Sequence, residues 1–93
     1  MNQTIILSGK MDEADRAETW SKRMARQAGR TAAEAEAFGE RVRRRYEMTA
    51  EECAAYEGLE KMTLSFEERK TGLSVELLAF GKPEEEMADP SAA

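Results

Sequence analysis

The chain has no histidine, and Cys53 is its only cysteine. Histidine is the side chain that most often acts as a base or a metal ligand near neutral pH, and a structural zinc site needs four thiolate or imidazole ligands. A single cysteine also excludes an intramolecular disulfide. Ser/His and Cys/His nucleophilic pairs are therefore ruled out. Carboxylate or lysine chemistry remains open, but no imidazole or second type of polar partner surrounds the glutamate clusters. We therefore expect no catalytic residue, no metal site and no cofactor, and hence a protein that is not an enzyme.

Long apolar runs are also missing. No stretch of about 18 apolar residues is available to span a bilayer, and residues 1–10 lack a basic leader followed by an apolar segment. The sequence thus predicts a cytoplasmic protein that makes no contact with a membrane. Its 93 residues are enough for one domain and too few for two. A core of this size is only marginally stable alone, so a homodimer is an open alternative.

The charges are numerous and unevenly distributed. Charged residues make up 35% of the chain, which has a net charge of −5. Residues 1–48 contain ten Lys or Arg against eight Asp or Glu, whereas residues 49–93 contain four against eleven. Because clustered cations dominate nucleic-acid binding, any such binding would have to use the N-terminal half. Direct nucleic-acid binding is therefore less expected than binding to another protein.

The first half of the chain predicts one strand and two helices. Residues 3–8 form a β-branched run that is typical of a strand. Asp12 is expected to cap a helix that ends at Gly29, and Thr31 and Glu34 form a capping box for a second helix. Gly39 should allow a neighbour to approach closely. The apolar stripes of the two helices consist of Ala14, Ala17, Trp20, Met24 and Ala28, and of Ala35, Phe38, Val42 and Tyr46.

The second half predicts a short third helix and a hairpin. Thr49 and Glu52 repeat the capping-box pattern, which indicates a helix that frays at Gly58. Residues 62–66 and 73–77 alternate between apolar and polar side chains and flank turn chemistry at residues 71–72. The predicted fold class is α+β, in the order β-α-α-(short α)-β-β. Two or three helices should pack on one face of a small, mainly antiparallel three-stranded sheet. Residues 1–81 form this single domain, and residues 82–93 are expected to be a disordered acidic tail.

Two groups of charged residues are candidate sites. Arg41, Arg44 and Arg45 lie on neighbouring turns of the second helix and form a candidate basic patch. The alternative is a solvated helix whose arginines pair with nearby glutamates such as Glu40 and Glu47. The second group is a candidate acidic surface, made of Glu67, Glu68 and Glu76, which would either imitate nucleic acid or simply keep the protein soluble.

An apolar patch is the candidate partner-binding site. If Leu73, Val75 and Leu77 face the helices, strand alternation turns Leu78 and Phe80 to the opposite face, and Ile6 lies on that face of the first strand. Ile6, Leu78 and Phe80 are therefore expected to form an exposed patch. The alternatives are that another segment covers them or that a bulge turns them inward.

Residues 3–46 resemble the ribbon-helix-helix family of DNA-binding regulators. The resemblance rests on the short N-terminal strand, the helix that ends in Ala-Arg-Gln-Ala-Gly at residues 25–29, and the Arg-Thr-Ala-Ala-Glu segment at residues 30–34 that opens the next helix. It implies a dimeric repressor or antitoxin that binds operator DNA. In such a protein the acidic half would hold a toxin.

The composition instead favours a small, non-catalytic acidic protein that binds another protein. Such a protein would act as a stoichiometric inhibitor or regulator of the kind carried by phages and mobile elements, of which anti-CRISPR proteins are an example. Its partner would be a protein, with a nucleic-acid-handling complex as one candidate. The repressor or antitoxin is the alternative.

Overall fold

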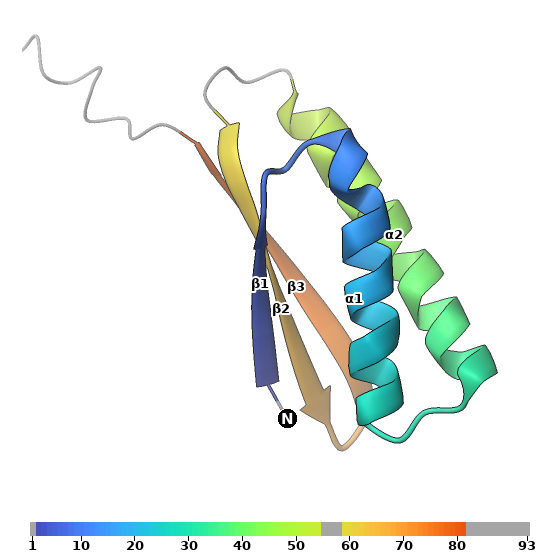
Figure 1. Ribbon diagram of the computed structural model, residues 1–93. Coiled ribbons are helices and arrows are strands. Elements are labelled where there is room, and N and C mark those ends of the chain that lie inside the picture. The colour runs from blue at the N-terminus through green and yellow to red at the C-terminus, as the bar shows by residue number, and fades with distance from the viewer. Residues whose placement is uncertain (1, 55–58, 82–93) are drawn as a thin grey trace, which may run out of the picture.

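The computed structural model describes residues 2–54 and 59–81. It has two layers, in which two helices lie side by side on one face of a three-stranded antiparallel sheet (Figure 1). The elements are β1 (Asn2–Leu7), the 3-10 turn η1 (Met11–Glu13), α1 (Ala14–Gln27), α2 (Ala32–Cys53), β2 (Leu59–Arg69) and β3 (Gly72–Gly81). The predicted α+β class and the placement of the helices on one face of the sheet are confirmed.

The turn between the helices follows the sequence pattern. Gly29 has a φ of 91°, a conformation that favours glycine, and its N–H donates to the carbonyl of Arg26. The N–H of Arg30 reaches back to the carbonyl of Ala25, which completes a Schellman motif at the end of α1. At the start of α2, Thr31 and Glu34 form both hydrogen bonds of the predicted capping box.

The start of α1 differs from the prediction. Asp12 lies inside η1 and does not cap α1, whose N-cap is Glu13. The side chain of Glu13 instead accepts a hydrogen bond from the backbone N–H of Ser8, at the end of β1, and pairs with Arg16. The chain needs the 3-10 turn to pass from the sheet to the helix layer, and this turn moves the helix start beyond Asp12.

The predicted third helix is wrong as a separate element. α2 continues for 22 residues through Thr49 to Cys53, so Thr49 is an interior helical residue and not a cap. The stripe buried under α2 runs beyond Tyr46 to Ala50, which is 5% exposed, and the packing of this extra turn favours continuing the helix. Residues 55–58 of the predicted helix lie outside the described residues.

The sheet has the strand order β1-β2-β3, with β2 in the centre. The strands of the hairpin are longer than predicted, because residues 67–69 belong to β2 and only Lys70 and Thr71 form the turn. Gly72 closes the turn with a φ of 143°. β1 pairs with β2 from Asn2↔Glu67 to Leu7↔Met62. The predicted tail, residues 82–93, lies outside the part of the chain that the structure describes.

The core lies between the two layers. The stripes predicted for both helices face it, as do Leu7, Met62, Leu64 and Phe66 from the sheet. Phe66 packs edge-on against Trp20 of α1 and Phe38 of α2, with ring centroids 6.4 and 6.0 Å apart. The inward side chains of β3, Leu73, Val75 and Leu77, are only half-buried. The helix layer therefore leaves this edge of the sheet partly uncovered.

Candidate functional site

The predicted apolar patch lies on the outer face of the sheet, away from the helices. Ile6 pairs with Thr63, which pairs with Leu78, so the three residues form one row across the strands. Ile6 is 60% exposed and Leu78 is 44% exposed. The backbone of Phe80 in β3 pairs with that of Lys61 in β2, but the side chain of Phe80 is not among the parts that the structure describes. The structure thus places Ile6 and Leu78 on one exposed row, with Thr63 between them.

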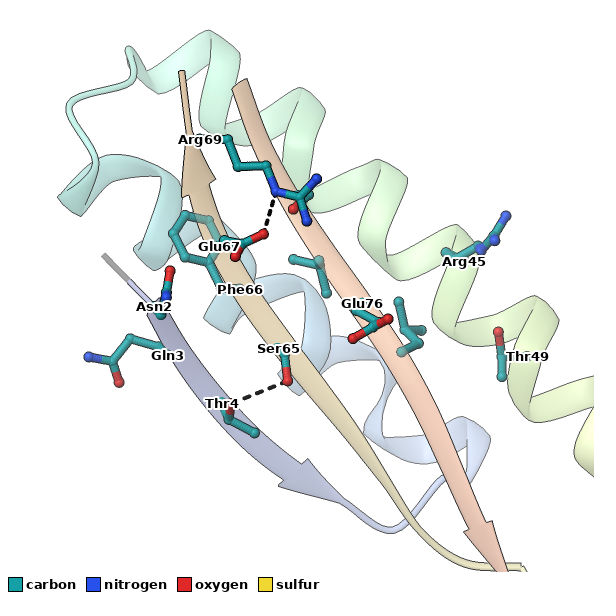
Figure 2. Close-up of a pocket in the computed structure, with 13 residues that line it drawn as sticks. Asn2, Gln3, Thr4, Arg45, Thr49, Ser65, Phe66, Glu67, Arg69 and Glu76 are labelled. Carbon is teal, nitrogen blue, oxygen red and sulfur yellow. Dashed lines mark hydrogen bonds and ion pairs between the residues drawn. The ribbon is translucent and has the colours of Figure 1, made fainter. Parts of the chain in front are cut away.

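The other outward side chains of the sheet are polar, and many of them line a hollow of about 560 Å³ that also reaches Val75 and Leu77 at the edge strand β3 (Figure 2). The hydroxyl groups of Thr4 and Ser65 are hydrogen-bonded at 3.2 Å, and Glu67 pairs with Arg69. Arg45 and Thr49 stand on α2, beyond the edge of β3 (Figure 2). The hydroxyls of Thr4 and Ser65 can bond a polar ligand, and the half-buried Val75 and Leu77 supply apolar lining.

The three predicted acidic residues do not form one surface. Glu67 lies opposite Ser74 and Glu76 lies opposite Ser65, which makes the two glutamates diagonal neighbours on the outer face. Glu68 lies opposite the inward-facing Leu73, so its side chain belongs to the helix side of the sheet. Only two carboxylates of the proposed acidic surface therefore share a face.

The predicted basic patch lies on exposed turns of α2. Arg41, Arg44 and Arg45 are all exposed, and no carboxylate of the described residues lies within 4.0 Å of their guanidinium groups. The alternative prediction is that arginines of this helix pair with glutamates. Arg43 forms such ion pairs, because it contacts Glu18, Asp15 and Glu47. These contacts favour the charged form and raise the pKa of Arg43.

The arginines line a groove that the sequence analysis did not predict. The α2–β3 groove lies between α2 and the neighbouring edge strand β3 and has a volume of about 510 Å³. Its base is apolar and consists of Phe38, Val42 and Met48 from α2 and Leu73, Val75 and Leu77 from β3. Arg41, Arg44 and Arg45 lie along its α2 side. An adjoining hollow of about 280 Å³ shares Phe38, Arg41 and Leu73 and extends the groove to Gly72.

One sequence signal could have revealed the groove. Arg41, Arg44, Arg45 and Met48 recur at three- and four-residue spacing, which makes a second stripe on α2 beside the buried one. Met48 follows the arginines in this stripe and adds an apolar side chain that is 57% exposed. A mixed stripe of this kind indicates a helix face at the border of the core. The sequence could not predict that β3 is the strand beside this face of α2, because the neighbouring strand depends on the strand order in the sheet.

Metal sites and membrane-spanning helices were sought in the described residues. Residues 2–54 and 59–81 contain no group of three or more Cys, Asp or Glu side chains placed to hold a metal ion. No helix among them is both long and apolar enough to cross a membrane. No protein-family model, curated protein or solved structure matches the chain.

Proposed function

We propose that this chain is a small, non-catalytic cytoplasmic protein that inhibits or regulates another protein by binding it through the α2–β3 groove. One observation carries the proposal: along one strand edge, a half-covered apolar base meets three arginines that pair with no carboxylate of residues 2–54 and 59–81. These three arginines form a local group of positive charge on a chain whose net charge is −5.

The chemistry of the groove matches that of protein interfaces. Leu73, Val75 and Leu77 are half-buried in the free chain, and each Å² of apolar surface that a partner covers contributes about 25 cal/mol. Arginine and methionine are enriched at interfaces, where a guanidinium group combines a long apolar stem with several hydrogen-bond donors. Met48 and Arg45 supply these residue types at the α2 side of the groove. These contacts support recognition of a protein surface.

The alternative role is a ribbon-helix-helix-like DNA-binding repressor or antitoxin. The residues of β1 that face outward, Asn2, Thr4 and Ile6, include no cation to attract phosphate. The three arginines lie beside β3, and β3 is at the opposite edge of the sheet from β1. Although Arg45 and residues of β1 line the same outer hollow, β2 and β3 lie between β1 and α2, which favours the protein-binding role.

A capture experiment with matched variants tests the proposal. The full chain is immobilised, exposed to a lysate of its host cell, and compared with Met48→Glu and with Ile6→Glu, which changes the other exposed apolar face. We expect a stoichiometric protein partner to be retained by the native chain and by Ile6→Glu and lost by Met48→Glu. Both substituted positions are more than half exposed, so circular-dichroism melts should remain close to native.

Three results would contradict the proposal. Equal capture by the native chain and Met48→Glu would exclude the α2–β3 groove. Loss of capture by Ile6→Glu alone would assign binding to the outer sheet face. Capture of DNA in place of protein, weakened steeply by salt, would favour the repressor role.

A further inference from the structure

The α2–β3 groove runs along an open strand edge. In the described part of the chain β3 pairs with β2 alone, so its other edge presents alternate N–H and C=O groups without a strand partner. Natural edge strands are usually protected by lysine, proline or a bulge. β3 contains no lysine and no proline, and Glu76 is its only charged residue. The single irregularity in its pairing lies between Leu59 and Lys61, which leaves Gly72 to Ala79 regular.

From these features we propose that the occupant of the groove is an extended acidic segment of the partner protein, which adds to β3 as a fourth strand. This inference rests on the proposed function and specifies the chemistry of the partner. An added strand would hydrogen-bond to the open edge of β3 and direct every second side chain towards the helix layer. There these side chains would contact Leu77, Val75 and Met48, which together form an apolar surface.

Charge decides which segment fits. Arg41, Arg44 and Arg45 lie along the α2 side of the groove and have no carboxylate of the described chain within ion-pair distance. Carboxylates at the helix-facing ends of the added strand would pair with these arginines, whereas lysines there would be repelled. On the outer face the charged residue of β3 is Glu76, which would repel a carboxylate on the added strand. The expected pattern is acidic and apolar inward, with no carboxylate outward.

A second copy of the chain fits the groove less well. If β3 paired with β3 of another copy about a two-fold axis, the arginines of both α2 helices would face the same seam, and like charges at an interface oppose association. A nucleic acid is also less suitable. It would use the arginines but leave the apolar base and the peptide edge unmatched. An acidic peptide strand uses all three features.

The test uses three synthetic peptides with the full chain labelled with ¹⁵N. The first, acetyl-Glu-Thr-Val-Thr-Val-Thr-Glu-amide, follows the expected pattern. The second replaces both Glu residues by Lys, and the third carries N-methyl groups on the backbone amides that would pair with β3. We expect the first peptide to shift the amide signals of β3 saturably and to slow hydrogen exchange at its open edge. The Lys peptide and the N-methylated peptide should each bind at least about tenfold more weakly.

A charge-reversal variant provides the control. Arg41→Glu/Arg45→Glu changes exposed side chains only, so it should keep the native melt and prefer the Lys peptide. The proposal is overturned if the Glu and Lys peptides bind equally, if N-methylation has no effect, if the shifts map to β1, or if no peptide binds. Concentration-dependent dimerisation that protects β3 would assign the edge to a second copy, and shifts caused only by duplex DNA would assign it to nucleic acid. All of these failures leave the capture experiment with Met48→Glu intact, so the two proposals can be judged separately.

Discussion

Gly39 lies where α2 packs against Lys22 and the backbone of Glu18 in α1. A Cβ atom added at residue 39 would lie 2.4 Å from Cγ of Lys22 and 3.2 Å from the carbonyl oxygen of Glu18. The first distance is shorter than any normal contact, and Cγ is close to the backbone of Lys22. Either the lysine side chain or the helix must therefore move.

Gly39→Ala is expected to lower the free energy of unfolding by about 1–3 kcal/mol, as other overpacked sites do. At an unconstrained helix position the same change would raise it by up to about 1 kcal/mol. Urea denaturation measures the difference. In a Lys22→Ala background the cost should shrink, because only the contact with Glu18 remains. An equal cost in both backgrounds would show that Lys22 is not the obstacle.

Ser21 is fully buried, and its Oγ has no hydrogen-bond partner among the described residues. A buried hydroxyl without a partner destabilises the fold, and serine is also a poorer helix former than alanine. Ser21→Ala should therefore raise the free energy of unfolding by about 1 kcal/mol, measured by urea denaturation. Ser65→Ala is the control, because it removes a hydroxyl that is bonded to Thr4 and should not stabilise. A destabilised Ser21→Ala protein would mean that Oγ of Ser21 is satisfied.

At the scale of the elements, α1 and α2 are joined by a network of ion pairs on their exposed side. Glu18 contacts Lys22 at 2.7 Å and Arg43 at 2.9 Å, and Lys22 also contacts Glu36 at 3.0 Å. Hydrogen bonds from Lys22 and Arg43 lower the pKa of Glu18. The folded state therefore favours the ionised form of this carboxylate. Because these side chains are only partly buried, salt should still weaken the pairs.

The lowered pKa of Glu18 predicts the direction of the pH dependence. The stabilisation that it provides is complete above the pKa of the unfolded chain and is lost as the pH falls through the lower pKa of the folded state. Glu18→Gln should therefore be less stable than the native chain at neutral pH, and the difference should shrink in acid. Urea midpoints across this pH range test the prediction. Glu40→Gln, an exposed change outside the network, is the control and should leave the urea midpoint at neutral pH close to that of the native chain.

At the scale of the whole molecule, the core formed by the described residues ends before the last residues of β3. Its buried and half-buried members extend from Ile5 to Leu77. A chain that ends at residue 81 keeps all of them and all three strands. We expect removal of residues 82–93 to leave the thermal midpoint within a few degrees of the native value, as measured by circular dichroism. A large fall would show that the removed residues stabilise the domain.

Local patterns in the sequence determined most of the fold. The 3.6-residue stripes, the capping box at Thr31 and the glycine at residue 29 act over one or two turns, and the structure uses all three. Strand alternation likewise placed Ile6 and Leu78 on the outer face. These features need only the geometry of a single element, which the residue order specifies.

Only the tertiary structure decided the remaining features. Thr31 and Thr49 have the same capping-box signature, but only Thr31 is a cap, because packing under Ala50 keeps α2 helical through Thr49. Four arginines share one turn and a half of α2, yet Arg43 alone reaches the acids of α1, while the others border a groove beside β3. Which helix face meets α1 and which meets β3 depends on the order of the strands and on how two helices cover three of them. These contacts join residues far apart in the sequence, which no local pattern encodes.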